Sequence, residues 1–250
     1  MSGKIWAFGC SQTYGHGLED CIVRPVTPQE IEDASKWNVP FAPGKEPSKF
    51  AYPQLIGNAL NKEVINLSRP GASNKYILRK IKMSQSEMSP DDIVLIGWTN
   101  KDRYIILKEN IDCYWFGLHP TQIGRSKLAD TYYKHIHDDN DADIVTMWYM
   151  NYAYLTLKVT GIKSIHCPIT FDMCPSEGQS MPPLDPQEYD YRYFIKSQTN
   201  DSKFEVGLPL LSKTFMHPDI DKDFALDNIH QGPKTHRTFA DLIITEFLTQ

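Results

Sequence analysis

Short apolar runs alternate along the chain with longer stretches in which apolar and polar residues recur at helical spacing. The short runs are rich in β-branched and aromatic residues, which is typical of buried parallel strands. Four are predicted as strands: KIWAFGC from Lys4, EVINLS from Glu63, DIVLIGW ending at Trp98, and KSIHCPI from Lys163. Helical patterns fill the intervals: FAYPQLIGNALN, NKYILRKIKMSQSEM, DIVTMWYMNYAYLTLKVTG and, near the end of the chain, TFADLIITEFL. This alternation predicts βαβ units and an α/β fold with a mainly parallel sheet covered on both faces.

Two segments interrupt the alternation. Residues 19–48 are rich in proline, and residues 168–226 are rich in Pro, Asp, Tyr and Ser with only weak strand signals. Loops of this length inside a compact domain usually serve as lids or binding surfaces. We therefore expect a single domain over residues 1–250 with two long insertions, about 19–48 and 168–226.

Composition narrows the class of protein. A chain of 250 residues with 41% hydrophobic content can bury one substantial core. The net charge of −5 argues against a general nucleic-acid-binding surface. Five scattered cysteines lack metal-ligand spacing and indicate reduced thiols. No run is long enough for a signal-peptide core or a membrane span, so we expect a cytoplasmic protein without a membrane span. The oligomeric state is not predicted.

Polar residues with chemical potential follow the predicted strands. Ser11 comes just after the first strand, Gly71 after the second and Asn100 after the third, while Asp227 and His230 precede the last helix. The carboxyl ends of parallel strands meet at one sheet edge, which is where such sheets bind ligands. A hydroxyl, an imidazole to take its proton, a carboxylate to orient that imidazole and donors for an oxyanion together form the set needed for serine acyl transfer.

The same residues resemble the conserved blocks of the SGNH (GDSL-type) hydrolase family, in the family's order. The four segments are FGCSQTYG, VINLSRPGASN, VLIGWTNKDR and DNIHQGPKTHRTFADLI. The resemblance implies Ser11 as nucleophile, Asp227 and His230 as the dyad, and Gly71 and Asn100 as oxyanion donors. It also implies a flavodoxin-like three-layer sandwich with about five parallel strands in the order 2-1-3-4-5, and no cofactor or metal. The short, cysteine-containing forms of the first and third segments resemble uncharacterised members from bacteriophages and marine microbes.

Some alternatives stay open at the level of sequence. Thr99 can take the place of Asn100 as oxyanion donor, because the family usually has one residue between the glycine and the asparagine of the third segment, whereas two residues separate Gly97 from Asn100. His119, in GLHPTQIGRSKLA, is the principal rival to His230, although Phe116 stands where a carboxylate would be needed.

Two further segments are given structural interpretations. HIHDDNDAD (135–143) is predicted to be a solvated acidic turn before a helix, since Ile144 and Met150 stand where a calcium loop needs Gly and Glu. Asn74 and Lys75 are expected to cap the following helix.

The expected function is hydrolysis of a small acyl ester through an acyl-enzyme, with an O-acetylated carbohydrate as a plausible substrate. Tyr189, Tyr191, Arg192 and Tyr193 in the second insertion suit a carbohydrate better than a long acyl chain. The alternative is a catalytically silent SGNH-like domain that serves as a structural or carbohydrate-binding module.

Overall fold

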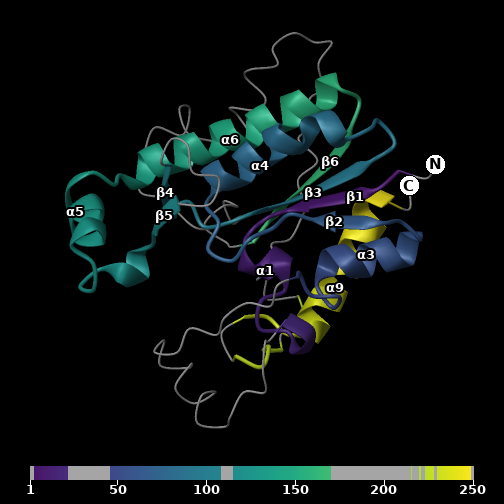
Figure 1. Cartoon of the computed structure of the whole chain (residues 1–250), viewed down its shortest axis with the longest axis horizontal. Helices are drawn as coiled ribbons and strands as arrows, with labels where there is room; N and C mark the ends of the chain where they lie inside the picture. Colours follow the sequence, from purple (N-terminus) through teal and green to yellow (C-terminus); the bar gives the residue numbers. More distant parts are fainter. Residues whose placement is uncertain are drawn as a thin grey trace, which may run out of the picture.

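A parallel sheet of four strands forms the centre of the fold (Figure 1). The computed structural model describes residues 3–21, 46–107, 115–169, 215, 220, 223–227 and 230–248. The strands are β1 (Ile5–Phe8), β2 (Val64–Asn66), β3 (Ile93–Trp98) and β6 (Lys163–Pro168), in the spatial order β2-β1-β3-β6. In the register, Ala7 pairs with Leu95, and Leu95 pairs with Ile165. All four predicted strands are confirmed, and the order of the first four agrees with the expected 2-1-3-4.

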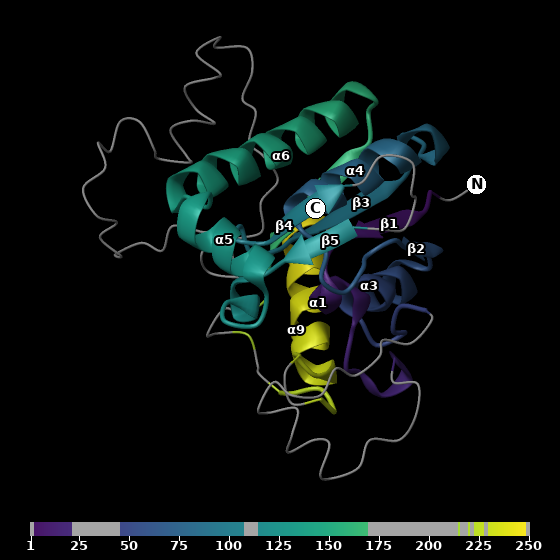
Figure 2. The ribbon, with the colours of Figure 1, turned by 60° about the vertical axis from the view of Figure 1, so that its left-hand side comes forward.

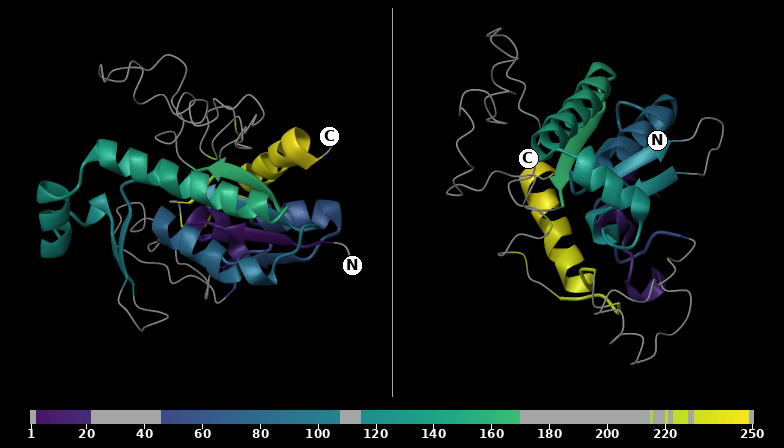
Figure 3. Two further views of the ribbon diagram at one scale, coloured as in Figure 1. Left: turned by 90° about the horizontal axis from the view of Figure 1, so that it is seen from above. Right: turned by 90° about the vertical axis from the view of Figure 1, so that its left-hand side faces the viewer.

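Helices cover both faces of this sheet. Helices α3 (Tyr52–Leu60) and α9 (Pro233–Ile243) pack together on one face. Helices α4 (Asn74–Ser84) and α6 (Asp139–Val159) lie side by side on the other, as the view from above in Figure 3 shows. The short helix α1 (Ser11–Tyr14) follows β1 directly. The predicted three-layer α/β sandwich is confirmed, although the described residues supply four parallel strands rather than about five. No described helix is both long enough and apolar enough to cross a bilayer.

A small substructure that the hydrophobic pattern does not predict lies beyond the end of β3. Strands β4 (Tyr104–Leu107) and β5 (Trp115–Leu118) form an antiparallel pair, and helix α5 (Lys127–His135) follows it (Figure 2). The shorter turns are η1 (Glu19–Cys21), η2 (Gln85–Glu87), η3 (Pro120–Gln122) and the π-helical η5 (Ile244–Leu248). Most of the two predicted insertions, including Tyr189 to Tyr193, lies outside the described residues.

The interpretation of 135–143 as an acidic turn is wrong for most of its length. Helix α6 begins at Asp139, because the Asp138 side chain accepts hydrogen bonds from the Asn140 and Asp141 N–H groups and so caps the helix. Carboxylates in the first turn are also favoured by the partial positive charge of a helix N-terminus. The acidic run is therefore a helix start.

The predicted cap of α4 is also wrong. Ser73 is the N-cap, and its Oγ accepts a hydrogen bond from the Tyr76 N–H. Asn74 instead reaches sideways and binds the backbone of Thr99. Lys75 extends over the ring of Tyr104, with Nζ 5.6 Å from its centroid.

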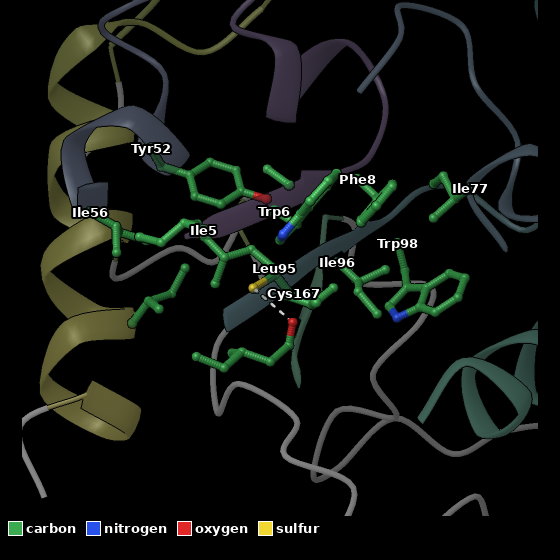
Figure 4. Close-up of a cluster of buried hydrophobic side chains, with 14 of the residues drawn as sticks. Ile5, Trp6, Phe8, Tyr52, Ile56, Ile77, Leu95, Ile96, Trp98 and Cys167 are labelled. Atoms are coloured by element: carbon green, nitrogen blue, oxygen red, sulfur yellow. Dashed lines mark hydrogen bonds between the residues drawn. The ribbon is translucent and has the colours of Figure 1, made fainter. Parts of the chain in front are cut away.

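The core fills the space between the sheet and its helices. Figure 4 shows Ile5 near Ile56 of α3, and Phe8 on the side of Ile77 of α4. Because successive side chains of a strand point to opposite faces, a strand buried on both faces reads as a continuous apolar run. That is why the central strands β1 and β3 are the clearest signals in the sequence.

Asp92 ties the start of β1 to the start of β3. Its buried carboxylate accepts hydrogen bonds from Lys4 N (2.6 Å), Trp6 Nε1 (2.9 Å) and Ser89 N (2.9 Å). Burial alone would raise the pKa of this carboxyl, but the three donors outweigh burial and lower the pKa below 3.8. The ionised form is therefore the one that the fold stabilises.

We expect Asp92→Ala to lower the free energy of unfolding by about 3 kcal/mol, because it leaves three donors, the buried Trp6 Nε1 among them, without a charged acceptor. Since the folded pKa lies below the unfolded value, the contribution is present above the unfolded pKa and is lost as pH falls through the folded pKa. Urea unfolding at pH 7 and at pH 3 measures both effects. The exposed neighbour Asp91 is the control: Asp91→Ala should change little, and an equal loss for both variants would contradict the assignment.

Candidate active site

Helix α1 is held at the carboxyl ends of the parallel strands, and it carries Ser11. The Thr13 side chain lies directly over Gly9 and Gly97, where an added Cβ would approach Thr13 Oγ1 to 2.1 Å. Only glycine at these two strand ends lets the helix come so close. Thr13 Oγ1 also shares a hydrogen bond with Tyr52 Oη (3.1 Å), and Asn66 Nδ2 donates to Thr13 O (2.9 Å). Ser11 is consequently fixed above the edge of β1, β2 and β3.

Asp227 and His230 form a tight pair before α9. His230 Nδ1 lies 2.6 Å from Asp227 Oδ2, and the His230 N–H donates to Asp227 Oδ1 at 3.0 Å. The Asp227 side chain is 1% exposed and that of His230 16%. An ionised Asp227 can only accept, so Nδ1 carries the hydrogen and Nε2 presents its lone pair. This is the tautomer that a general base requires.

Hydrogen bonds hold the Asp227–His230 dyad against the segment that follows Ser11. The Leu226 N–H donates to Gly17 O (3.0 Å), and the Gln231 N–H donates to Gln12 Oε1 (3.4 Å). Gly17 has φ of +89°, and a Cβ at this position would come within 2.5 to 2.8 Å of the Asp227 carboxylate. The two ends of the chain therefore meet at one place, which brings the surroundings of Ser11 and His230 together.

Residue His16 also contacts this pair. Its ring lies tilted against that of His230, with centroids 4.7 Å apart and planes inclined by 34°. Neither Gln12 nor His16 nor Gly17 is marked by a motif. The only signal for them in the sequence is their closeness to Ser11.

No hydrogen bond joins Ser11 Oγ to the His230 imidazole, both of which belong to the described part of the chain. Hydrogen bonds of this kind are often long in unliganded enzymes and tighten when substrate is bound.

The loop that contains Gly71 follows β2 along the same edge. The Arg69 N–H donates to Gly9 O (3.0 Å), which anchors the loop beside the start of α1. The Asn74 side chain then joins this loop to the end of β3: Asn74 Nδ2 donates to Thr99 O (3.0 Å), and Thr99 N donates to Asn74 Oδ1 (2.9 Å). The loops that carry Gly71 and Asn100 are thus tied to each other by a buried amide.

Asn100 rather than Thr99 has the exposure of a ligand-binding residue. Thr99 is 1% exposed, whereas Asn100 is half-buried. Asn100 Oδ1 accepts a hydrogen bond from the Asp102 N–H (2.7 Å), which leaves the amide nitrogen as the donor end of the side chain.

His119 lies at the end of β5, in a setting unlike that of His230. Burial and the positive charge of Arg103 lower the pKa of His119 to about 4. A histidine beside a cation is a weak base, whereas His230 has a carboxylate at 2.6 Å. Of the two histidines that the sequence leaves open, His230 has the environment of a catalytic base.

The other buried histidines have structural contacts. His236 Nδ1 accepts from the Tyr52 N–H (3.1 Å), and burial lowers the pKa of His236 to about 3. His166 Nδ1 accepts from Trp98 Nε1 (2.9 Å), and burial lowers its pKa to about 3 as well. Both rings are therefore neutral at physiological pH and hold elements together.

One group of side chains has the composition of a cation site. Single ligand atoms of Asp102, His137 and Asp139 lie within 4.8 Å of one another. However, Asp139 belongs to the positive end of α6, and Lys101 Nζ lies 2.7 Å from Asp143 close by. These positive charges disfavour a cation. We interpret the contacts of His137 with Asp102 (3.4 Å) and Asp139 (3.1 Å) as a tie between the end of β3 and the start of α6.

Among the comparisons with known proteins, two solved structures with a TM-score of 0.50 support the fold. No protein-family model and no curated protein sequence matches the chain. Among solved structures, a carbohydrate esterase whose active site displays divergent catalytic and non-catalytic binding functions matches with a TM-score of 0.50 and 13% identity, over 100% of this chain and 69% of that chain. A Corynascus thermopiles carbohydrate esterase family 2 enzyme with a carbohydrate-binding domain matches with a TM-score of 0.50 and 13% identity, over 98% and 67%. A member of the lipolytic protein G-D-S-L family from Veillonella parvula matches with a TM-score of 0.45 and 12% identity, over 99% of both chains. The expected resemblance to phage and marine proteins gains no support from these matches.

Proposed function

We propose that this chain, which has an SGNH hydrolase-like fold, is a serine esterase that hydrolyses small acyl esters, with O-acetylated carbohydrates as the favoured substrate class. Ser11 is the nucleophile, His230 the general base and acid, and Asp227 the residue that orients His230. Gly71, Asn100 and the Ser11 N–H supply hydrogen bonds to the oxyanion.

The proposed reaction has two half-reactions. Ser11 Oγ attacks the ester carbonyl while His230 Nε2 takes the hydroxyl proton, and the tetrahedral intermediate then expels the alcohol, which receives that proton. Water attacks the resulting acyl-serine with the help of His230, releases the carboxylic acid and restores Ser11. These steps use side chains and backbone N–H groups only.

The observation that carries the proposal is the Asp227–His230 pair, with its aspartate buried, held against residues 12–17. A 2.6 Å contact between a carboxylate and Nδ1 holds the imidazole in the basic tautomer. The backbone contacts to Gly17 and Gln12 bring this pair to the segment that carries Ser11. A surface histidine with a capping aspartate would need none of these contacts.

The preference for carbohydrate substrates is supported by the solved structures of the same fold that are carbohydrate esterases. At 13% identity they share only the fold, so the substrate class is a separate hypothesis. Release of acetate from acetylated oligosaccharides, compared with hydrolysis of 4-nitrophenyl esters of increasing chain length, tests it.

A fluorophosphonate probe tests the nucleophile and the base together. We expect the native chain to be labelled, Ser11→Ala to be unlabelled, and His230→Ala to be labelled at a rate lower by at least about 100-fold, since the hydroxyl loses its general base. His119→Ala should be labelled at the native rate. The exposed Ser86 offers the matched control Ser86→Ala. Fast labelling of His230→Ala together with slow labelling of His119→Ala would transfer the role to His119.

The second candidate function is a catalytically silent binding module. The missing hydrogen bond between Ser11 Oγ and His230 favours it, because an inactive site needs no such contact. No labelling of a folded native chain, combined with binding of a glycan, would establish the module and refute the esterase.

A further inference from the structure

Arg103 is a half-buried cation that has no ion-pair partner among the described residues. It follows Asn100 by three residues, at the point where the chain leaves the end of β3. Its Nη1 makes a long contact with Ala72 O (3.5 Å), and its Nε is buried and makes no hydrogen bond. No carboxylate in the described part of the chain forms an ion pair with it.

The neighbouring acid does not neutralise Arg103. Asp102 instead lies 3.4 Å from His137, and its backbone carbonyl accepts a hydrogen bond from Tyr133 Oη (2.7 Å). His119 is neutral at physiological pH, because burial and Arg103 itself lower its pKa to about 4. The positive charge at this place is therefore that of Arg103. Partial burial of a guanidinium without a counter-ion costs stability. A fold that retains such a group keeps hydrogen-bond donors and a positive charge with which a ligand can pair.

The guanidinium lies beside the proposed oxyanion edge. Ala72, whose carbonyl it contacts, follows Gly71, and Asn100 is on the same short connection as Arg103. The loop at 71–72 and the loop at 99–103 are tied together by Asn74, so this placement belongs to the framework of the site. A group bound by Arg103 would consequently be close to the ester carbonyl.

We infer that Arg103 binds an anionic group, a carboxylate or an acid of similar shape, on the ester substrate. The inference rests on the proposed esterase function and narrows its substrate class. A guanidinium presents parallel N–H donors that match the two oxygens of a carboxylate, and among the described residues Arg103 uses its Nη groups only in the long contact of Nη1 with Ala72 O. In this arrangement the substrate supplies the counter-charge that the described residues do not provide.

Matched pairs of esters test the inference on the whole chain. The first pair is the 4-nitrophenyl monoester of adipic acid and 4-nitrophenyl hexanoate, in which the charge is on the acyl side. The second pair is 4-acetoxybenzoate and its methyl ester, in which the charge is on the alcohol side. In the native protein we expect kcat/KM for one of the anionic members to exceed that of its neutral partner by about 10- to 100-fold, mainly through KM, as for a hydrogen bond to a charged group. Arg103→Gln should bring that pair to parity and leave the neutral ester nearly unchanged. Arg103→Lys should keep part of the preference.

The control is Arg125→Gln, which removes the same charge from an exposed position and should keep the preference. Equal kcat/KM for charged and neutral esters in the native protein would overturn the inference. An equal loss of kcat/KM on both esters in Arg103→Gln would also overturn it, because the Arg103 charge would then stabilise the oxyanion and not a charged group of the substrate. If no ester is hydrolysed, the proposed function fails, and ligand binding then tests the anion site at Arg103 by itself. Adipate or 4-hydroxybenzoate should then raise the Tm of Ser11→Ala but not of Ser11→Ala/Arg103→Gln, and the absence of a shift in both variants would overturn it.

Discussion

Replacing Ser11 by alanine is expected to lower kcat/KM for 4-nitrophenyl acetate by about 10⁴- to 10⁶-fold, to the rate that transition-state binding alone supports. The hydroxyl is the atom that forms the covalent bond to the acyl group, so no neighbouring group can replace it. Cys10 precedes it but is 1% exposed and lies in the hydrophobic core. Kinetics at saturating and limiting substrate, together with mass spectrometry of the acyl-enzyme, measure the effect.

The loss should be chemical rather than structural. Ser11 makes no side-chain hydrogen bond within the described residues, so its removal leaves the contacts that hold α1 intact, namely those of Thr13 with Tyr52 and Asn66. We expect the Tm of Ser11→Ala to remain close to the native value. Activity that survives in Ser11→Ala at more than a tenth of the native level would refute the proposed nucleophile.

Asp227→Asn is expected to lower kcat by about 10³- to 10⁴-fold while preserving the fold, since an amide in this position selects the wrong imidazole tautomer. The amide oxygen would keep the hydrogen bond from the His230 N–H (3.0 Å). The amide nitrogen would then face Nδ1 at the position of Oδ2 and donate to it. Nδ1 would become the acceptor and the proton would move to Nε2, which could no longer take a proton from Ser11. Turnover and pre-steady-state acylation rates measure the loss.

Asp223 provides a matched control in the same region. Its carboxylate accepts from the Lys234 and Thr235 N–H groups at the start of α9, and these contacts hold the helix rather than the imidazole. Asp223→Asn should therefore lower the Tm and keep most of the activity. Equal losses of activity in Asp223→Asn and Asp227→Asn would show that the aspartates act through local folding and not through the tautomer of His230.

The secondary structure around the site could be predicted from local pattern because the central strands β1 and β3 are buried on both faces. The runs at 93–98 and 163–168 are typical of strands in a covered parallel sheet, and their alternation with helical segments favours the same arrangement. The hydrophobic pattern places the start of α6 too late, because it begins after the cap at Asp138. The same pattern does not predict the β4–β5 pair, because this antiparallel pair lies outside the βαβ alternation.

The residues of the proposed site likewise fall into those that the sequence indicates and those that only the structure reveals. Ser11, Gly71, Asn100, Asp227 and His230 could be proposed from residue type and from the rule that strand ends converge. His16, Gly17, Asn74 and Arg103 could not, because their roles depend on contacts with residues far away in the sequence. Gly17 is separated from Asp227 by 210 positions in the sequence, yet a methyl group added at Gly17 would clash with the Asp227 carboxylate.

The sequence by itself determined the α/β class and supplied the residues proposed for acyl transfer, because hydrophobic periodicity and side-chain chemistry are properties of short segments. The strand order came from the resemblance of four such segments to the SGNH family. Only the tertiary structure decided that the Asp227–His230 pair lies on the segment after Ser11, that the charge of Arg103 acts on His119, and that Arg103 has no counter-ion among the described residues. The physical reason is that proximity and burial arise from packing between distant segments, and these set both the tautomer of an imidazole and the pairing of a charge.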